Sequence, residues 1–125
     1  MGRIYSIQEH DATRKHWDLR LEMGGVLKSW AIPKEPSKDP MVKRLAIQVD
    51  NHDKDYAFFE GEIPGGRYGA GTVKLYDRGT YEMVDEKPGR KYVIDIKGSK
   101  LKGKFVLLRF PKGGGKEWLF FKKKE

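Results

Sequence analysis

Four ionisable side chains alternate with apolar residues along one short segment of the chain. They are His16, Asp18, Arg20 and Glu22. Successive side chains of a β-strand point to opposite faces, so these four groups share one face of an extended segment, about 6.5–7 Å apart along it. The apolar residues between them would point into a core. A divalent cation with ligand distances of about 2.0–2.2 Å can then be held between His16 and Asp18.

A second imidazole lies close by in the sequence. His10 precedes His16 by six residues, so it comes either from a paired strand or from the loop that enters this one, and it completes a His-His-Asp set. Imidazoles and a carboxylate suit Mn, Fe, Zn or Co. The chain has no Cys, which excludes disulfides, thiolate nucleophiles and Cys-type zinc sites. The competing interpretation is a solvated polar face, which is the usual reason for His-x-Asp on a strand.

Three further residues could contribute chemistry. His52 is the third of three histidines and follows an alternating segment over residues 44–50, while Tyr56 lies four residues later. Arg44, on the polar face of that segment, could lie beside Arg20 in an adjacent strand. Two guanidinium groups near a divalent cation would clamp a phosphate. Taken singly, these residues are equally explained as a turn histidine, a rim aromatic and a surface charge.

The elements that must position these groups are strands, because hydrophobicity alternates with period two and no segment sustains a helical period. Gly and Pro punctuate the alternating segments, and Gly79 separates two of them. Strands are predicted at residues 16–22, 26–32, 44–50, 56–63, 72–77, 80–84, 92–96, 104–110 and 116–122. This pattern predicts a mainly β fold, either a small antiparallel β-barrel of about eight strands or a tightly curved sandwich.

Length and charge limit the functional class. The chain has 125 residues, and residues 1–125 are expected to form a single domain. Lys and Arg number 26 against 18 Asp and Glu, giving a net charge of +8. Such an excess favours a polyanionic partner such as nucleic acid. No apolar run is long enough for a membrane span or a signal peptide, so we expect a cytoplasmic protein without membrane contact. We also expect a monomer.

Several sequence motifs follow one another in a fixed order and cover nearly the whole chain. They read HDATRKHWDLRLE (10–22), GVLKSWAIPK (25–34), KRLAIQV (43–49), DYA and FEGEIP (55–57 and 59–64), YGAGTV (68–73), and GKF with WLFFK (103–105 and 118–122). In this order, which is more specific than any single motif, they resemble a known family, the 3′-phosphoesterase domain of bacterial DNA ligase D. The length suggests a stand-alone version of the domain, as seen in archaea and some bacteria.

The resemblance implies an enzyme that heals DNA 3′ ends during break repair by non-homologous end joining. A phosphodiesterase step would remove a 3′-terminal ribonucleoside, and a phosphomonoesterase step would remove the resulting 3′-phosphate to leave a 3′-OH. The family depends on a divalent metal, typically Mn²⁺, with Co²⁺ or Zn²⁺ as alternatives. It places loops around an active-site groove on the outer face of a small barrel. The implied partners are DNA or RNA/DNA primer–template 3′ ends, with ligase, polymerase and Ku-like proteins as further candidates.

The resemblance also assigns residues by position. The implied metal ligands are His10, His16 and Asp18. The implied catalytic set is His10, His16, Asp18, Arg20, His52 and Tyr56, and the implied phosphate contacts are Arg20, Lys34, Arg44 and His52. His52 could be the general acid for the leaving oxygen or a hydrogen-bond donor to the transition state.

A different functional class fits the same composition. A basic, aromatic-rich β-barrel could bind nucleic acid without catalysis, or act mainly as a partner module in a repair complex. The His-His-Asp-Arg set separates the first alternative from an enzyme, since a binding module has no need of it. Candidate contacts to the nucleic-acid backbone are Lys28, Lys74, Arg78, Arg109 and Lys122.

Overall fold

The computed structural model describes residues 2–65, 70–112 and 114–124. Within these residues, one 3₁₀ turn, η1 (Lys54–Tyr56), accompanies a fold otherwise built of strands and their connections. The described residues contain no helix of the length and apolarity needed to cross a membrane. The strands are β1 (Arg3–Asp11), β2 (His16–Met23), β3 (Val26–Ile32), β4 (Arg44–His52), β5 (Gly61–Ile63), β6 (Gly71–Lys87), β7 (Lys91–Gly98), β8 (Lys102–Arg109) and β9 (Glu117–Lys122).

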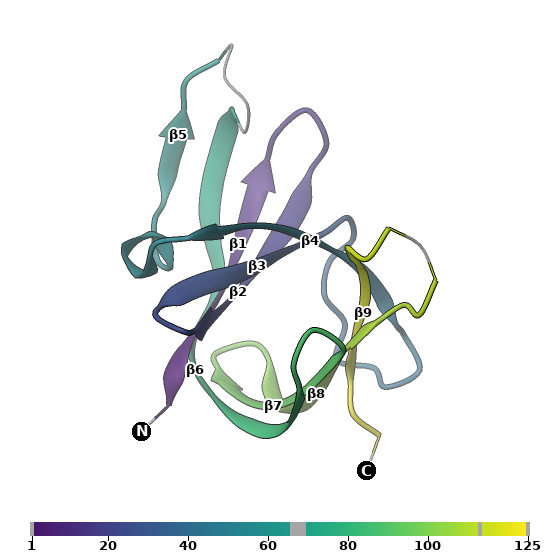
Figure 1. Cartoon of the computed structure of the whole chain (residues 1–125). Coiled ribbons are helices and arrows are strands. Elements are labelled where there is room, and N and C mark those ends of the chain that lie inside the picture. The colour runs from purple at the N-terminus through teal and green to yellow at the C-terminus, as the bar shows by residue number, and fades with distance from the viewer. Residues whose placement is uncertain (1, 66–69, 113, 125) are drawn as a thin grey trace.

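Eight of the strands close into an antiparallel barrel in the order β1-β2-β3-β4-β9-β8-β7-β6, and β1 pairs with β6 to complete the ring. The extra strand β5 pairs with the first residues of β6, where the two extend beyond the barrel (Figure 1). Closure leaves the eight barrel strands without the unpaired edge that an open sheet would expose. The predicted small antiparallel β-barrel is confirmed.

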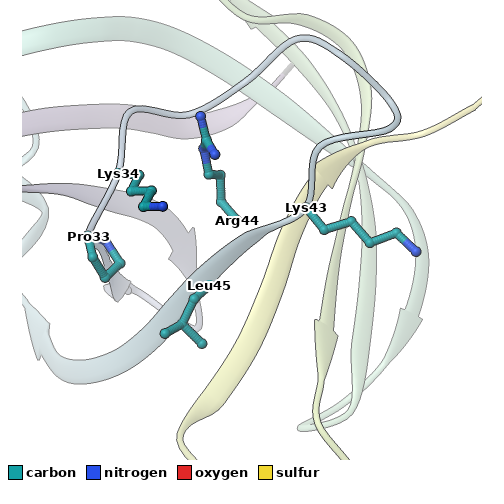
Figure 2. A pocket seen from close by; sticks show the side chains of 5 residues that line it. All are labelled: Pro33, Lys34, Lys43, Arg44 and Leu45. Atoms are coloured by element: carbon teal, nitrogen blue, oxygen red, sulfur yellow. The ribbon is translucent and has the colours of Figure 1, made fainter.

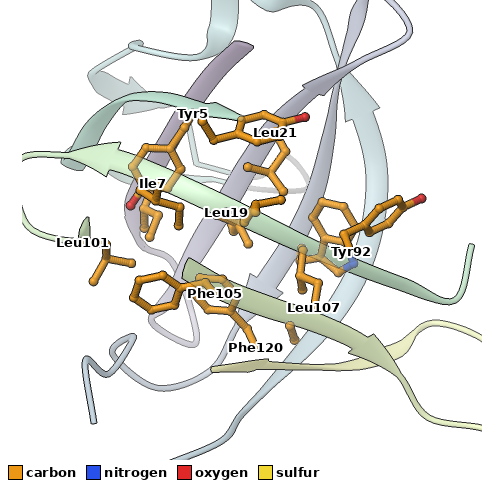
Figure 3. Close-up of a cluster of buried hydrophobic side chains, with 14 of the residues drawn as sticks. Tyr5, Ile7, Leu19, Leu21, Tyr92, Leu101, Phe105, Leu107 and Phe120 are labelled. Atoms are coloured by element: carbon orange, nitrogen blue, oxygen red, sulfur yellow. The ribbon is translucent and has the colours of Figure 1, made fainter. Parts of the chain in front are cut away.

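The barrel interior is filled by the apolar side chains that alternate along its strands (Figure 3). Leu19 and Leu21 of β2 are fully buried there, and Trp17 packs against the cluster, as predicted for the apolar face of this segment. Burial of a large apolar side chain contributes about 1.5–3 kcal/mol. The largest of these buried side chains are Trp30, Trp118, Tyr5, Tyr81, Phe105 and Phe120.

The predicted division of residues 72–84 into two strands is wrong, because β6 runs without a break from Gly71 to Lys87. Gly79 lies within this strand and pairs with Gly98 of β7. A Cβ atom at residue 79 would collide with the backbone of Lys97 and Gly98. The glycine therefore permits close approach of two strands rather than ending one.

The predicted strand over residues 56–63 is wrong in its first half. Tyr56 is the last residue of η1, residues 57–60 form a turn and an irregular segment, and only Gly61–Ile63 is a strand. Strand β1 was not predicted as a strand in its own right, although it supplies both the closure to β6 and one neighbour of β2. The first two residues of the YGAGTV motif lie outside the described residues, as does the last residue of Pro64-Gly65-Gly66, where the sequence predicts a turn after the strand over 56–63.

Asp77 is a buried carboxylate that joins three parts of the barrel. Its side chain accepts hydrogen bonds from the Tyr5 hydroxyl at 2.8 Å and from the backbone N–H groups of Ser99, Lys100 and Leu101 at 2.8–2.9 Å. Burial opposes ionisation, but these donors prevail and lower the pKa of Asp77. The ionised carboxylate therefore stabilises the turn between β7 and β8 against β1 and β6.

Replacing Asp77 tests this contribution. We expect Asp77→Asn to lower the free energy of unfolding at pH 7 by about 2–3 kcal/mol, because the amide N–H group would face backbone donors. Since the native pKa is below the unfolded value of about 3.9, the contribution is complete above that pH and is lost as pH falls through the native pKa.

Urea denaturation of the wild type and of Asp77→Asn at pH 7 and at about pH 3 measures their free energies of unfolding. The difference between the two proteins should be smaller at the lower pH. The exposed carboxylate of Asp85 on the same strand provides the control, and Asp85→Asn should change stability by no more than about 0.5 kcal/mol. Equal stabilities of Asp77→Asn and the wild type at pH 7 would contradict the assignment.

Candidate metal and phosphate site

The two imidazoles of the sequence motif come from paired strands, which settles the origin of His10. The antiparallel register of β1 and β2 sets His10 opposite His16, and Gln8 opposite Asp18. These residues alternate with the core-facing Ile7 and Leu19, so their side chains lie on the outer wall of the barrel. The hairpin alone therefore brings the predicted His-His-Asp set together.

Three potential ligand atoms converge at this point. His10 Nδ1 lies 3.2 Å from His16 Nε2, His16 Nε2 lies 3.2 Å from Asp18 Oδ2, and His10 Nδ1 lies 3.8 Å from Asp18 Oδ2. A point equidistant from the three atoms would be about 2.0 Å from each, which is the distance at which nitrogen and oxygen ligands bind a divalent cation. The geometry fits a cation held by two imidazoles and a carboxylate.

Hydrogen bonding fixes the form of His16 that faces this point. Its Nδ1 lies 3.0 Å from the backbone carbonyl of Arg14. A carbonyl only accepts, so Nδ1 carries the proton, and the Nε2 lone pair of the neutral ring points toward Asp18 and His10. The hydrogen bond with Asp18 is the main cause that raises the pKa of His16. A proton or a metal cation can therefore occupy the same position between these groups.

His10 and Asp18 are buried, each with 7% of its surface exposed. His10 Nε2 is also buried and has no hydrogen-bond partner among the described residues. Nδ1 is thus the ring atom through which this imidazole meets the cluster. The set of two nitrogen ligands and one oxygen ligand is typical of Mn, Fe, Co or Zn.

Arg20 lies next to Asp18 on the same face of β2. Its Nη2 lies 3.7 Å from Asp18 Oδ2, and its Nε donates to Gln8 Oε1 at 2.9 Å. Burial lowers the pKa of Arg20, yet a guanidinium remains charged at neutral pH. The charge is held in place beside the ligand set, where it can bind an anion that also contacts a metal cation.

Gln8 is a site residue that the sequence analysis missed. Besides accepting from Arg20, its amide Nε2 donates to the backbone carbonyls of Tyr56 and Phe59 at 2.9 and 3.0 Å. One side chain thus positions the guanidinium and also fixes the segment that covers it. The available signal was its place two residues before His10, which puts both on one strand face.

His52 reaches this wall because of a β-bulge. Leu27 pairs with His52 and Ser29 with Val49, so β4 has one residue more than β3 between these pairs. Without the extra residue, Asn51 rather than His52 would face the same side as Val49. The bulge therefore turns His52 to the outer face that also carries Arg20.

Tyr56 joins His52 to Arg20. The rings of His52 and Tyr56 stack with centroids 4.6 Å apart, and the Arg20 guanidinium carbon lies 5.2 Å from the Tyr56 ring centroid. Burial first, and then the charge of Arg20, lower the pKa of His52. Burial also raises the pKa of Tyr56. His52 is therefore neutral at pH 7 in the free protein.

Lys34 and Arg44 share a hollow that the residues of the ligand set do not line. The hollow has a volume of about 270 Å³, and Pro33, Lys43 and Leu45 also line it. Figure 2 shows Lys34 and Arg44 on facing sides of this hollow, with Lys43 directed away. The Arg44 Nε donates to the backbone carbonyl of Glu35 at 2.7 Å.

The prediction that Arg44 lies beside Arg20 in an adjacent strand is wrong. Strand β3 separates β4 from β2, and two steps between strands amount to about 10 Å. Arg44 also alternates with Ala46, which is fully buried in the core, whereas 39% of Leu45 is exposed. The apolar pattern of β4 therefore faces outward, because Trp118 fills the inner side and donates to Gln48 Oε1 at 3.2 Å.

The barrel also separates the candidate backbone contacts. Arg78 and Lys74 lie exposed on β6, beside β1. Arg109 and Lys122 lie on β8 and β9, which the strand order places across the barrel from β1 and β2. Arg78 pairs with Ser6 and shares the face of Gln8 and His10, whereas Lys74 pairs with Glu9 and lies on the opposite face.

Comparison with known proteins agrees with this geometry. The profile of the family described as "DNA Ligase D 3'-phosphoesterase domain" matches residues 8–109. A "Multifunctional non-homologous end joining protein LigD" of Pseudomonas aeruginosa is 48% identical over 97% of the chain. Proteins of the same name from Mycobacterium bovis and Mycolicibacterium smegmatis are 41% and 36% identical, over 94% and 97% of the chain.

These relatives are much longer proteins. The matched region makes up 15%, 16% and 17% of the three sequences, respectively. The similarity therefore concerns one domain of each relative, and covers nearly all of this chain. It includes both imidazoles and the carboxylate of the ligand set, which lie within the matched residues.

Metal binding can be measured without catalysis. We expect the wild type to bind Mn²⁺ at one site, and His16→Ala or Asp18→Asn to weaken binding by roughly 100-fold or more, since the first removes a ligand atom and the second replaces an anionic carboxylate with a neutral amide. Isothermal titration calorimetry and the loss of the free Mn²⁺ signal in electron paramagnetic resonance report the affinity. His52→Ala is the control, because His52 supplies no atom to the ligand set. Unchanged Mn²⁺ affinity in His16→Ala would refute the site.

Proposed function

The chain belongs to the DNA ligase D 3′-phosphoesterase domain family, and we propose that it is a metal-dependent phosphoesterase that processes DNA 3′ ends during non-homologous end joining. The observation that carries the proposal is the convergence of His10, His16 and Asp18 on one point, with the buried guanidinium of Arg20 beside it. A module that only binds nucleic acid has no need of this arrangement.

The proposed substrate is the 3′ end of a DNA or RNA/DNA primer strand. A phosphodiesterase step would release a terminal ribonucleoside, and a phosphomonoesterase step would then release the 3′-phosphate and leave a 3′-OH. Both steps cleave a phosphate ester at the same 3′ position, so one site can serve both. The net charge of +8 favours binding of the polyanion without regard to sequence.

The residues of the outer wall would divide the work. His10, His16 and Asp18 would hold the divalent cation, for which we propose Mn²⁺. Such a cation supplies a Lewis acid that polarises a phosphate oxygen and lowers the barrier to attack by water. Arg20 would bind the other oxygens of the same phosphate and stabilise the charge that develops on them.

His52 and Tyr56 would complete the phosphate site from the covering segment. His52 is neutral at pH 7 in the free protein because burial and Arg20 lower its pKa. Of the two roles open to it, this favours donation of an N–H hydrogen bond to a phosphate oxygen over proton transfer to the leaving group. Tyr56 would hold His52 and Arg20 in their relative positions through the ring contacts.

Lys34 and Arg44 are proposed to contact a second phosphate of the bound strand. Their hollow is lined by residues at the end of β3 and the start of β4 and by no residue of the ligand set, which favours a phosphate other than the one held by Arg20. Two cationic side chains that face one hollow suit a phosphodiester group of the adjoining nucleotides. Their loss should therefore weaken binding of long strands more than binding of a terminal phosphate.

A labelled primer tests the activity directly. We expect a 5′-labelled primer–template with one 3′-terminal ribonucleotide to be converted by the wild type in Mn²⁺ first to a 3′-phosphate and then to a 3′-OH, which gel mobility separates. Asp18→Asn should lose roughly 10³-fold in rate, because it removes a ligand and a charge. Full activity of the wild type in EDTA would exclude the proposal, as would conversion by Asp18→Asn at the wild-type rate.

The pH dependence of kcat/KM distinguishes the two roles of His52. This ratio reports groups of the free enzyme, and the pKa of His52 there lies below its ordinary value of 6.5. A neutral donor is fully present above that pKa, so kcat/KM should not fall between pH 6.5 and about pH 8. A general acid acts only in its protonated form. In that role His52 would make kcat/KM start to decline with rising pH already below pH 6.5, and His52→Gln would remove this decline.

A further inference from the structure

A stack of three rings extends from the proposed phosphate site into the covering segment. The His52 and Tyr56 rings are 4.6 Å apart at an angle of 21°, and the Tyr56 and Phe59 rings are 5.0 Å apart at 17°. Phe59 is the ring of the stack that contacts Tyr56 but not His52, and it has no polar atom that could act on a substrate. Its ring instead forms the surface on which Tyr56 rests.

Gly61 closes the stack behind Phe59. A Cβ atom at residue 61 would lie 3.1 Å from Cζ of the Phe59 ring, closer than ordinary packing permits, and the φ angle of 154° is one that side-chain-bearing residues rarely adopt. A side chain at this position would push the Phe59 ring toward Tyr56. The absence of a side chain thus sets where the ring can lie.

The backbone of the same segment is anchored at Tyr56 and at Phe59. Gln8 Nε2 donates to the carbonyls of Tyr56 and Phe59, and Glu60 Oε2 accepts from the backbone N–H of Leu75 on β6. These bonds fix the main chain but leave the torsions of the Tyr56 side chain free. The Phe59 ring is the contact that restricts the plane of Tyr56 on the side away from His52.

His52 has little other support on its own strand. It is the last residue of β4, and beyond the bulge it pairs only with Leu27. Its ring is held by stacking on Tyr56, whose ring also lies beside the Arg20 guanidinium. A shift of Tyr56 would therefore move the imidazole and the guanidinium contact together.

We propose that Phe59 is a positioning residue which fixes His52 relative to Arg20 through the Tyr56 ring, and that Gly61 is required because it leaves room for the Phe59 ring. The proposal rests on the proposed phosphoesterase function for its catalytic consequence. It assigns Phe59 no contact with substrate or metal. It predicts that Phe59 affects turnover, since a misplacement of about 1 Å at a reacting group can cost 100-fold in rate.

The adjacent Phe58 provides a matched control. Its ring packs under the Arg78 guanidinium, whose carbon lies 4.0 Å from the ring centroid, and it has no ring contact with the stack. Phe58 and Phe59 have the same side chain, neighbouring positions and similar partial burial. A general effect of losing an aromatic ring from the segment would be common to both positions.

The experiment compares Phe59→Ala, Phe59→Leu, Gly61→Ala and Phe58→Ala with the wild type at 25 °C in Mn²⁺. We expect both Phe59 variants and Gly61→Ala to lower kcat for 3′-phosphate removal by about 10-fold or more, with Mn²⁺ affinity within about 2-fold of the wild type. Phe58→Ala should retain kcat. Phe59→Leu keeps the apolar volume without the flat ring, so it decides the question if Phe59→Ala does not fold.

The imidazole of His52 supplies a second measurement that needs no catalysis. Titration of the His52 ring signals by NMR gives the pKa of this imidazole. The pKa should rise toward 6.5 in Phe59→Ala and Phe59→Leu, because the imidazole becomes less buried when Tyr56 shifts. It should not rise in Phe58→Ala. The charged groups that act on this pKa are Arg20, Asp18, Asp50 and Asp53, and the variants remove none of them.

The outcomes separate the two proposals. Phe59 variants whose kcat and His52 titration match those of Phe58→Ala overturn the positioning role. A wild type that hydrolyses neither 3′ end overturns the proposed function, while the titration still decides whether Phe59 fixes His52. A lowered melting temperature with unchanged kcat and unchanged titration shows that Phe59 only stabilises the fold, which also overturns the inference.

Discussion

The register of the β1–β2 hairpin is the constraint on which the site depends. Pairing of His10 with His16 sets two imidazoles face to face, and the alternation of β2 adds the Asp18 carboxylate on the same wall. A slip of one residue would turn one strand's polar groups into the barrel. The buried apolar side chains of the same strands, such as Ile7 and Leu19, oppose such a slip because they would become exposed. The core therefore selects the geometry of the ligand set.

A polar wall of this kind must be covered if its charges are to act at full strength. The segment from η1 to β5 crosses the outer face and leaves Gln8 fully buried and Arg20 only 4% exposed. Coulombic interactions are stronger away from bulk water, but a buried guanidinium also needs hydrogen-bond partners. Gln8 accepts a hydrogen bond from Arg20, and it donates to the backbone of the segment that shields Arg20 from water. The covering segment and the charge beneath it are thus mutually dependent.

Period-two alternation predicted most of the strands, and within a single hairpin it also predicted that His16 and Asp18 share one face with His10 close by. It did not predict how His52 joins Arg20, which depends on one extra residue in β4 opposite β3. It also misplaced Arg44, since an alternating pattern marks two faces without saying which one is inside. Trp118, more than 70 residues away in the chain, decides that by filling the inner side next to Gln48. Gly79 was misread for a similar reason, because its role lies in the approach of β7. Contacts between distant segments, rather than local propensity, account for these differences.

The two halves of the site differ in how far apart their parts lie along the chain. The His10–His16 contact spans six residues, whereas the bond from Gln8 to the Tyr56 carbonyl spans 48 and the Tyr5–Asp77 bond near the barrel seam spans 72. Pairings between remote residues lose more chain entropy and slow folding. The hairpin that carries His10, His16 and Asp18 is accordingly the most local part of the proposed site, and the part around Gln8 and Tyr56 forms only as the remote segments come together. In a chain emerging from the ribosome, all three residues of the proposed ligand set would have appeared long before β9, the last strand that the barrel needs for closure.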